Sequence, residues 1–421
     1  MLKFILKGLL RDRSRSFFPI LIVTAGVMVI VFMASYLDGF VRSMLNQNAR
    51  FETGHLKIVT NAYAENISQK PYDLGFIDMG DEMDDWKKDF PGIRWTPRIY
   101  FGALLDVPDS IGETREQGNV FGLAVDLKDE TVVDDFRLQE SLVRGRLPQK
   151  PNEIILSETL FDKLGLALNS TVTLLGSSFF GAMSFANFSV CGTVTFGVEA
   201  IDRSGLIADI EDVRTFLDMQ DGASEYFGYL PGGEYDDETV QNIKQQFNAK
   251  YNLGDEFDPV MLALTDQNDL GFLLLYMKFA MALISFVFVI IIGIVLWNAG
   301  LMNGIRRYGE FGLRLAMGES KGHLYGWLLI ESLVIGIIGS VIGAALSIVA
   351  VLYFKDKGFN FSAILKDTSM MVENVIYTTL NWKNVLLGML PGIMATILGA
   401  LLAGLGIFRR KTSQLFKELE T

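Results

Sequence analysis

The chain has 421 residues, of which 50% are hydrophobic and 20% are charged, and it carries a formal net charge of −12. So much apolar content beside so many charges argues against an ordinary soluble protein. Residues 38–270 hold 40 acidic and 19 basic residues, which argues against nucleic acid as a partner. The single cysteine, Cys191, excludes an intrachain disulfide, and we interpret it as a small buried strand residue rather than a nucleophile.

Four stretches reach the roughly 20 apolar residues that a membrane-spanning helix needs. We expect transmembrane helices at 17–40, 271–299, 324–354 and 385–408. The first follows a basic segment, residues 1–16, whose apolar stripe predicts an interfacial helix on the membrane surface. Because the first apolar run is long and lacks a small-residue cleavage site, we interpret it as an uncleaved anchor.

The basic residues predict the orientation of these helices. They gather in the N-terminal segment, in the 300–323 loop and in the 409–421 tail, which the Lys/Arg bias places in the cytoplasm. The acidic block 41–270 and the shorter 355–384 loop then lie outside. The sequence therefore predicts an α-helical membrane protein with four transmembrane helices in a 1+3 arrangement, a large extracytoplasmic domain between the first and second, and both termini in the cytoplasm.

The extracytoplasmic domain is predicted to be mixed α/β. Alternating apolar patterns predict strands at 51–60, 93–107, 118–125, 171–175 and 188–194, with a polar connection at 61–75. Helical patterns cover 81–90, 157–164, 210–219 and 237–251, and Ser157 is placed to cap one of them. The acidic clusters 81–85 and 234–238 lack calcium-loop spacing, so we interpret them as solvated faces rather than a cation site.

Motifs for catalysis are absent from the sequence. It contains no HExxH, CxxC or GxSxG motif and no GxxxxGK[ST] loop that would hold phosphates. His55 and His323, the two histidines, fall on opposite sides of the predicted membrane and cannot share a site. We therefore expect a chain that is not an enzyme, carries no cofactor or metal and does not hydrolyse ATP unaided.

The segment 306–322, RRYGEFGLRLAMGESKG, lies between the second and third predicted spans. Its helical stripe is formed by Tyr308, Phe311, Gly312 and Leu315. Glu310 is placed to pair with Arg306 or Arg314. Gly318 follows as a left-handed helix stop, and Ser320 is placed to cap the next helix. We interpret the segment as a short helix presented to a partner; the alternative is a basic loop that merely orients the protein.

Small residues four apart mark the third and fourth predicted spans and permit close helix approach. We expect packing at Gly336, Gly339, Gly343, Gly388 and Gly392. Pro391 predicts a bend. Glu331, the acid within a span, is a functional candidate by default, but its place near Ser320 favours a partner at the cytoplasmic boundary.

At these residues the sequence resembles a known family. The stretch GEFGLRLAMGESKGHLYGWLLIESLVIGIIGSVIGAALS is similar to the signature of the FtsX-like permeases, ABC-transporter subunits that include MacB-type and lipoprotein-releasing LolC/LolE-type proteins. The family's pattern falls on Glu310, Gly312, Arg314, Ala316, Gly318, Glu331, Gly339 and Gly343. FGLAVDLKDE, LVRGRLPQKPNEIILSETLFDKLGLALNSTVTLLG and FSVCGTVTFG resemble the external domain of MacB- and Lol-type permeases.

The resemblance implies a bacterial inner-membrane complex. Two copies of a separate ABC ATPase, which bind the ATP and Mg, would dock on the 306–322 helix. A second permease subunit, the same chain or a paralogue, would complete the membrane part. ATP-driven closure would then move the external domain, a mechanism called mechanotransmission, to release or translocate a lipoprotein or another periplasmic or lipid-anchored substrate.

Other functions remain open alongside lipoprotein release. The chain could serve as a MacB-like efflux permease, or as an FtsX-like regulator of a cell-wall hydrolase without transport. A membrane enzyme or ion-binding receptor is a third class, which the lack of a catalytic constellation disfavours.

Overall fold

The computed structural model describes residues 13–109, 111–306, 308–360 and 375–409. Most of the predicted interfacial helix 1–16, nearly all of the 409–421 tail and the middle of the 355–384 loop lie outside these residues. The chain divides into two compact units. The helical unit holds the described residues up to Ser43 and from Leu274 onward, and the mixed domain spans Met44–Leu273.

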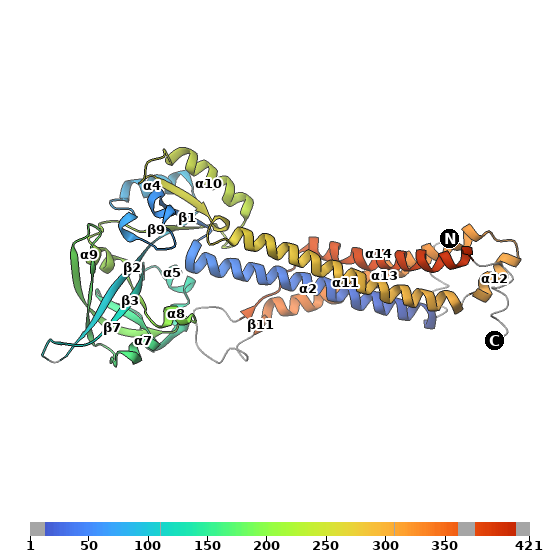
Figure 1. Cartoon of the computed structure of the whole chain (residues 1–421), viewed down its shortest axis with the longest axis horizontal. Coiled ribbons are helices and arrows are strands. Elements are labelled where there is room, and N and C mark those ends of the chain that lie inside the picture. Colours follow the sequence, from blue (N-terminus) through green and yellow to red (C-terminus); the bar gives the residue numbers. More distant parts are fainter. Residues whose placement is uncertain (1–12, 110, 307, 361–374, 410–421) are drawn as a thin grey trace. The chain divides into compact units, whose positions relative to one another are not determined.

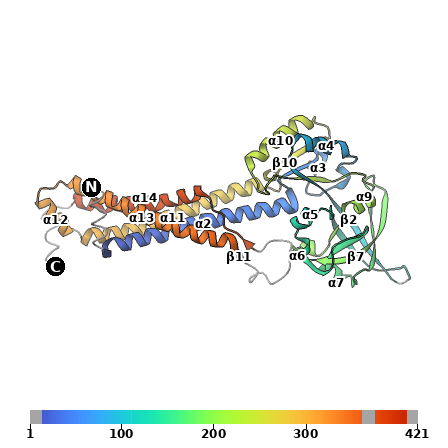
Figure 2. The same cartoon turned by 180° about the vertical axis from the view of Figure 1, so that it is seen from behind.

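The helical unit is built from long apolar helices that run side by side (Figures 1 and 2). Within the described residues, four helices are long and apolar enough to cross a membrane. They are α2 (Arg13–Asn48), α11 (Leu270–Arg306), α13 (Lys321–Lys357) and α14 (Trp382–Arg409). The short helix α12 (Tyr308–Ala316) lies between α11 and α13, and strands β11 (Phe359–Asn360) and β12 (Val375–Ile376) pair antiparallel between α13 and α14.

The long helices continue past the predicted transmembrane boundaries. Helix α2 runs beyond residue 40 to Asn48, and α11 runs through the start of the predicted 300–323 loop to Arg306. The residues that follow the apolar run in α2, VRSMLNQN, contain no glycine or proline, so nothing in them stops the helix. Apolar content sets the predicted span, whereas backbone hydrogen bonding sets the end of the helix.

Ten strands of the mixed domain form one sheet, and six of them close into a ring. The pairings run β2–β3–β8–β5–β7–β6 and return to β2. Strands β9, β1 and β10 extend the sheet from the first part of β2, and β4 extends it from β7. The strands are β1 (Leu56–Thr60), β2 (Arg94–Pro108), β3 (Thr114–Val125), β4 (Leu142–Gly145), β5 (Glu153–Ser157), β6 (Thr171–Ser177), β7 (Met183–Val194), β8 (Gly205–Asp209), β9 (Glu225–Tyr229) and β10 (Pro259–Ala263).

Short helices cover this sheet. Helices α4 and α10 lie together over β1, β9 and β10, where Trp86 and Phe247 are buried (Figures 1 and 2). Ser157 caps α7 by accepting a hydrogen bond from the Leu160 N–H, as predicted. The helices are α3 (Asn61–Glu65), α4 (Gly80–Asp89), α5 (Glu130–Asp135), α6 (Leu138–Ser141), α7 (Glu158–Lys163), α8 (Glu199–Asp202), α9 (Ile210–Leu217) and α10 (Asp237–Tyr251), with 3₁₀ turns η2 (Tyr72–Leu74) and η3 (Leu264–Asp266).

Strands β5 and β8 of the ring are buried on both of their faces. In β5, Ile154 and Leu156 belong to one buried cluster with α7 and α9, whereas Ile155 belongs to a second cluster with α5 and α6. Strand β8 divides its residues in the same way. Both strands are absent from the sequence prediction, because a strand buried on both faces has no polar alternation to mark it.

Several predicted boundaries were wrong. The predicted strand 51–60 is half helical, since the π-helical turn η1 (Ala49–Thr53) continues α2 and β1 begins only at Leu56. The predicted connection 61–75 contains α3 and η2. Strands β3 and β7 begin earlier than predicted. The first residues of β3, 114–117, are exposed and polar, so no apolar pattern marks them.

Candidate functional site

Helix α12 occupies the segment predicted to contact a partner. Its residues Tyr308, Glu310 and Phe311 have side chains outside what the structure describes. Gly312 is buried, Arg314 and Leu315 are half-buried, and Ala316 is exposed.

Two apolar side chains that the sequence analysis did not single out are exposed beside these residues. Leu313 is 55% exposed and Met317 is 72% exposed. Because they lie four residues apart, they occupy neighbouring positions on one face of the helical turn.

The end of α12 is built as the sequence predicted. Gly318 has φ +95°, in the region that favours glycine. Its N–H donates to the Leu315 carbonyl at 3.1 Å, and the Glu319 N–H donates to the Arg314 carbonyl at 3.1 Å. These two bonds are those of a Schellman motif, which satisfies the last carbonyl groups of a helix. The stop therefore separates α12 from α13 at a defined residue.

Helix α13 begins at Lys321, three residues after Gly318. The Ser320 side chain accepts a hydrogen bond from the His323 N–H at 3.3 Å, which confirms the predicted cap. The Trp327 indole donates to His323 Nε2 at 3.0 Å. The connection between α12 and α13 is thus only Met317 to Ser320 long, with hydrogen bonds at both of its ends.

Glycines of α13 provide the close approach that their spacing predicted, and the structure identifies what they face. A Cβ atom built on Gly339 would lie 2.7 Å from Val23 Cβ, and one on Gly343 would lie 2.6 Å from the Thr24 carbonyl oxygen, both on α2. Gly336 faces α14 instead, where a Cβ would lie 2.4 Å from Thr396 Oγ1. No side chain fits at such distances.

Glycines of α14 face the same helix α2. A Cβ on Gly388 would lie 2.6 Å from Val31 Cγ2, and one on Gly392 would lie 2.5 Å from Val27 Cγ2. Val23, Val27 and Val31 recur every four residues, so they form one ridge along α2 that enters the glycine grooves of α13 and α14. This valine ridge was missed, although its spacing in the first apolar run is visible in the sequence.

Polar groups strengthen this packing. The Thr24 hydroxyl donates to the Gly339 carbonyl at 3.2 Å, and the buried Ser340 hydroxyl donates to the Met389 carbonyl at 3.3 Å. Glu331 is half-buried within α13, and a partner for it at a cytoplasmic boundary stays a prediction. Pro391 lies inside α14, where the predicted bend likewise stays a prediction.

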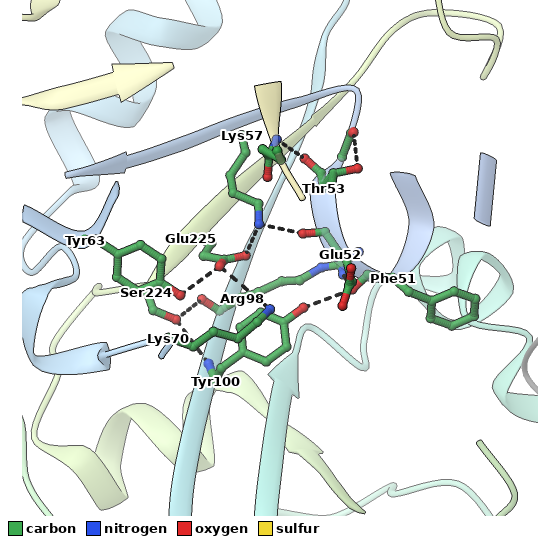
Figure 3. Close-up of polar contacts among 12 residues, drawn as sticks. Phe51, Glu52, Thr53, Lys57, Tyr63, Lys70, Arg98, Tyr100, Ser224 and Glu225 are labelled. Carbon is green, nitrogen blue, oxygen red and sulfur yellow. Dashed lines mark hydrogen bonds and ion pairs between the residues drawn. The ribbon is translucent and has the colours of Figure 1, made fainter. Parts of the chain in front are cut away.

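In the mixed domain, the end of α2 and the turn η1 are held by side chains of the sheet (Figure 3). Lys57 Nζ donates to the Glu52 carbonyl at 2.5 Å. Arg98 donates to the Arg50 carbonyl at 2.6 Å and to the Phe51 carbonyl at 3.1 Å. We call the four donors Lys57, Arg98, Tyr100 and Tyr229 the carbonyl clamp, because the tyrosine hydroxyls donate to the Phe51 and Ala49 carbonyls at 3.0 and 3.1 Å.

The clamp matches the chemistry of a helix end. The last carbonyls of a helix lack partners within it and carry a partial negative charge, so cations there are stabilising. Lys57 is buried and pairs with the buried Glu225 at 2.9 Å. Burial lowers the pKa of Lys57 to about 8, against the opposing effect of the Glu225 carboxylate. Arg98 also lies over the Phe227 ring, with its guanidinium carbon 3.7 Å from the centroid.

Neither the histidines nor the cysteine form a reactive cluster. His55 Nδ1 accepts the Leu230 N–H at 3.1 Å, and burial lowers the pKa of His55 to about 4, with Arg94 contributing. Cys191 is buried in β7, and burial raises the pKa of its thiol to about 11. In the described part of the chain, no three His, Cys, Asp or Glu side chains are grouped to hold a metal.

Comparison with known families accounts for both units. Residues 16–246 match the model of the MacB-like periplasmic core domain, and residues 282–412 match that of the FtsX-like permease C-terminal region. The chain belongs to the FtsX-like, MacB-type permease family. Permeases of this family are subunits of ABC transporters whose ATPase is a partner. The four apolar helices and this membership indicate a multi-pass protein of the bacterial inner membrane.

A protein similar to this permease is found among the solved structures. The crystal structure of the periplasmic region of MacB from Actinobacillus actinomycetemcomitans is 14% identical, with a TM-score of 0.33. The similarity covers 50% of this permease and 88% of that chain. No curated protein matches the permease.

Proposed function

We propose that this permease transmits the ATP-driven motion of a separate ATPase to its mixed domain. The observation that carries the proposal is α12 with its connection to α13. Its exposed Leu313 and Met317 suit insertion into a cleft of a partner, where buried apolar anchors contribute most of the binding energy. The residues predicted for this contact are Tyr308, Glu310, Phe311, Gly312, Arg314, Leu315, Ala316 and Gly318.

The packing of the helical unit supports a path for that motion. The helix stop at Gly318 and the cap at Ser320 make the connection between α12 and α13 short and fix both of its ends by hydrogen bonds. Since the glycines of α13 and α14 enclose the valine ridge of α2, a displacement of α13 shifts α2 with it. Helix α2 is continuous into the mixed domain, where the carbonyl clamp holds its end to β1, β2 and β9.

We further propose the 1+3 membrane arrangement, with both termini in the cytoplasm and the mixed domain in the periplasm. The complete complex would contain two ATPase copies and a second permease subunit, the same chain or a paralogue. Release or translocation of a lipoprotein or another periplasmic substrate is the activity we favour. The exposed apolar side chains of the β6–β7 hairpin, Phe180, Met183 and Phe185, support contact with an apolar partner. MacB-like efflux and FtsX-like regulation of a hydrolase are the alternatives.

Charge substitutions on α12 test the docking proposal. Phe311→Asp and Met317→Asp each place a carboxylate in the proposed cleft, which is expected to cost several kcal/mol of binding free energy. Both variants should insert into the membrane but fail to co-purify with the ATPase. Phe311→Leu keeps an apolar anchor and Arg307→Ala removes a charge that lies off the predicted stripe, so both should bind nearly as the wild type does. Full binding and full coupled ATPase activity in both Asp variants would refute docking at α12.

A further inference from the structure

A second feature of the mixed domain adjoins the carbonyl clamp and shares Tyr100 with it. A pocket of about 400 Å³ opens between the end of α2, the turn η1, strands β2, β3 and β8, helix α8, and Phe136, which follows α5. Its volume falls within the range of about 300–1,000 Å³ that is usual for small-molecule sites. Five aromatic residues line it, namely Phe51, Tyr100, Phe121, Phe136 and Phe196.

The aromatic rings form walls. Phe51 and Phe136 meet edge to face with centroids 5.6 Å apart, and Tyr100 stacks with Phe121 at 5.9 Å. Phe121 and Val198 remain exposed toward the opening although both are apolar. Contiguous apolar surface of this kind is typical of a ligand site.

The charged residues of the lining are Lys70 and Glu52, and Lys70 belongs to a network behind the pocket. In this network Lys57 and Lys70 pair with one buried carboxylate, Glu225, and Arg98 lies opposite Glu225 across strands β2 and β9 (Figure 3). Lys57 takes the near position on this carboxylate, at 2.9 Å, whereas Lys70 Nζ is 3.9 Å from it. The donors of Arg98 are directed to the Arg50 and Phe51 carbonyls and to the Tyr229 hydroxyl.

Lys70 is therefore the cation that the network leaves available. Its Nζ lies 3.4 Å from the centroid of the Tyr100 ring, and its side chain is 20% exposed. Among the described residues, its ammonium donates no hydrogen bond. Glu52, the acidic residue of the lining, accepts a hydrogen bond from Asn268 at 2.7 Å. An ammonium with unused donors beside aromatic walls complements an anion that carries an apolar chain.

We propose that this pocket binds a single-chain anionic amphiphile. Its aliphatic chain lies between the Phe51–Phe136 and Tyr100–Phe121 pairs, and its anionic head group accepts hydrogen bonds from Lys70. The inference goes beyond the coupling function and does not depend on docking of an ATPase at α12.

Thiol protection in the full-length permease tests the site. In a Cys191→Ser background, Val198→Cys places a thiol at the rim, where the native side chain is 44% exposed. Val143→Cys, on β4 and outside the pocket lining, is the matched control because Val143 is 45% exposed. Both proteins are placed in nanodiscs of zwitterionic lipid and modified with a water-soluble maleimide, with dodecanoate or dodecanol as the probe.

Dodecanoate is expected to slow modification of Val198→Cys at least fivefold and to leave Val143→Cys unchanged. Dodecanol, which has the same chain without the charge, should protect much less. Adding Lys70→Met should remove the advantage of dodecanoate, whereas Lys70→Arg should retain it. Ile201→Trp, which fills the pocket, should abolish protection.

Each contrary result overturns the proposal. Equal protection at both cysteines would mean a general effect of the amphiphile, and no protection at Val198→Cys would mean an unoccupied pocket. Equal protection by dodecanoate and dodecanol, or by dodecanoate with and without Lys70, would refute recognition of the anion. None of these readouts uses ATPase activity, so they are independent of the α12 experiments.

Discussion

Replacing Arg98 with methionine should loosen the carbonyl clamp. Arg98 is 2% exposed, and its guanidinium makes three hydrogen bonds, to the Arg50 carbonyl at 2.6 Å, the Phe51 carbonyl at 3.1 Å and the Tyr229 hydroxyl at 2.8 Å. Methionine keeps much of the apolar stem but donates nothing. The end of α2 would then lose its principal cationic contact with β2.

The expected loss of stability follows from these bonds. A hydrogen bond to a charged group contributes about 1.5–3 kcal/mol. The loss is smaller than three such bonds, because the Phe51 carbonyl keeps the Tyr100 hydroxyl and no charge has to be buried in the variant. We expect a net destabilisation of about 3 kcal/mol. For a domain of this size that corresponds to a fall in Tm of about 6–12 °C.

The single cysteine provides the assay. Cys191 is buried in β7, so a fluorogenic maleimide reacts with it only as the mixed domain opens on heating. The midpoint of labelling in the purified full-length chain reports unfolding of that domain. Arg115→Met is the matched control, because Arg115 also donates to two carbonyls at a helix end, those of Leu164 and Gly165, but is exposed. Its Tm should change little.

Two outcomes would refute the reasoning. If Arg98→Met had the same Tm as the wild type, the clamp would contribute nothing to the stability of the domain. If Arg98→Met and Arg115→Met shifted Tm equally, burial of the arginine would not be what gives its hydrogen bonds their strength.

Three further predictions concern packing, pH and topology. Gly343→Leu should weaken assembly or coupled ATPase activity without preventing insertion, because its side chain meets the α2 backbone; normal assembly and activity would refute this. Burial lowers the pKa of His55 to about 4 in the folded protein, so the unfolded chain binds a proton more readily below pH 6.5. The free energy of unfolding should therefore fall by up to about 3 kcal/mol as the pH drops from about 6.5 to about 4. His55→Asn keeps an acceptor for the Leu230 N–H and should flatten the dependence of Tm on pH between 6.5 and 4.5. In Cys191→Ser, Glu130→Cys should label from outside intact cells and Glu319→Cys only after permeabilisation; labelling of both in intact cells would refute the topology.

Local signals in the sequence were sufficient for several elements. The bounds of α10 agree with the predicted 237–251, and α12 stops at Gly318 before Ser320 caps α13. A cap, a left-handed glycine and a helical stripe act over a few neighbouring residues, so their consequences are visible without the rest of the chain. Family membership was also predictable, because the residues of its signature are contiguous.

The arrangement of distant segments was decided by the tertiary structure. Glycine spacing predicted close packing, but only the fold shows that Gly339, Gly343, Gly388 and Gly392 all receive valines or backbone of α2. In the same way Lys57, Arg98 and Tyr229, from three strands, converge on carbonyls of one helix end. These arrangements depend on which helices and strands pack beside one another. The apolar pattern of each strand specifies that it is buried, but not its neighbour, and so neither the clamp nor the aromatic pocket has a signature in the sequence.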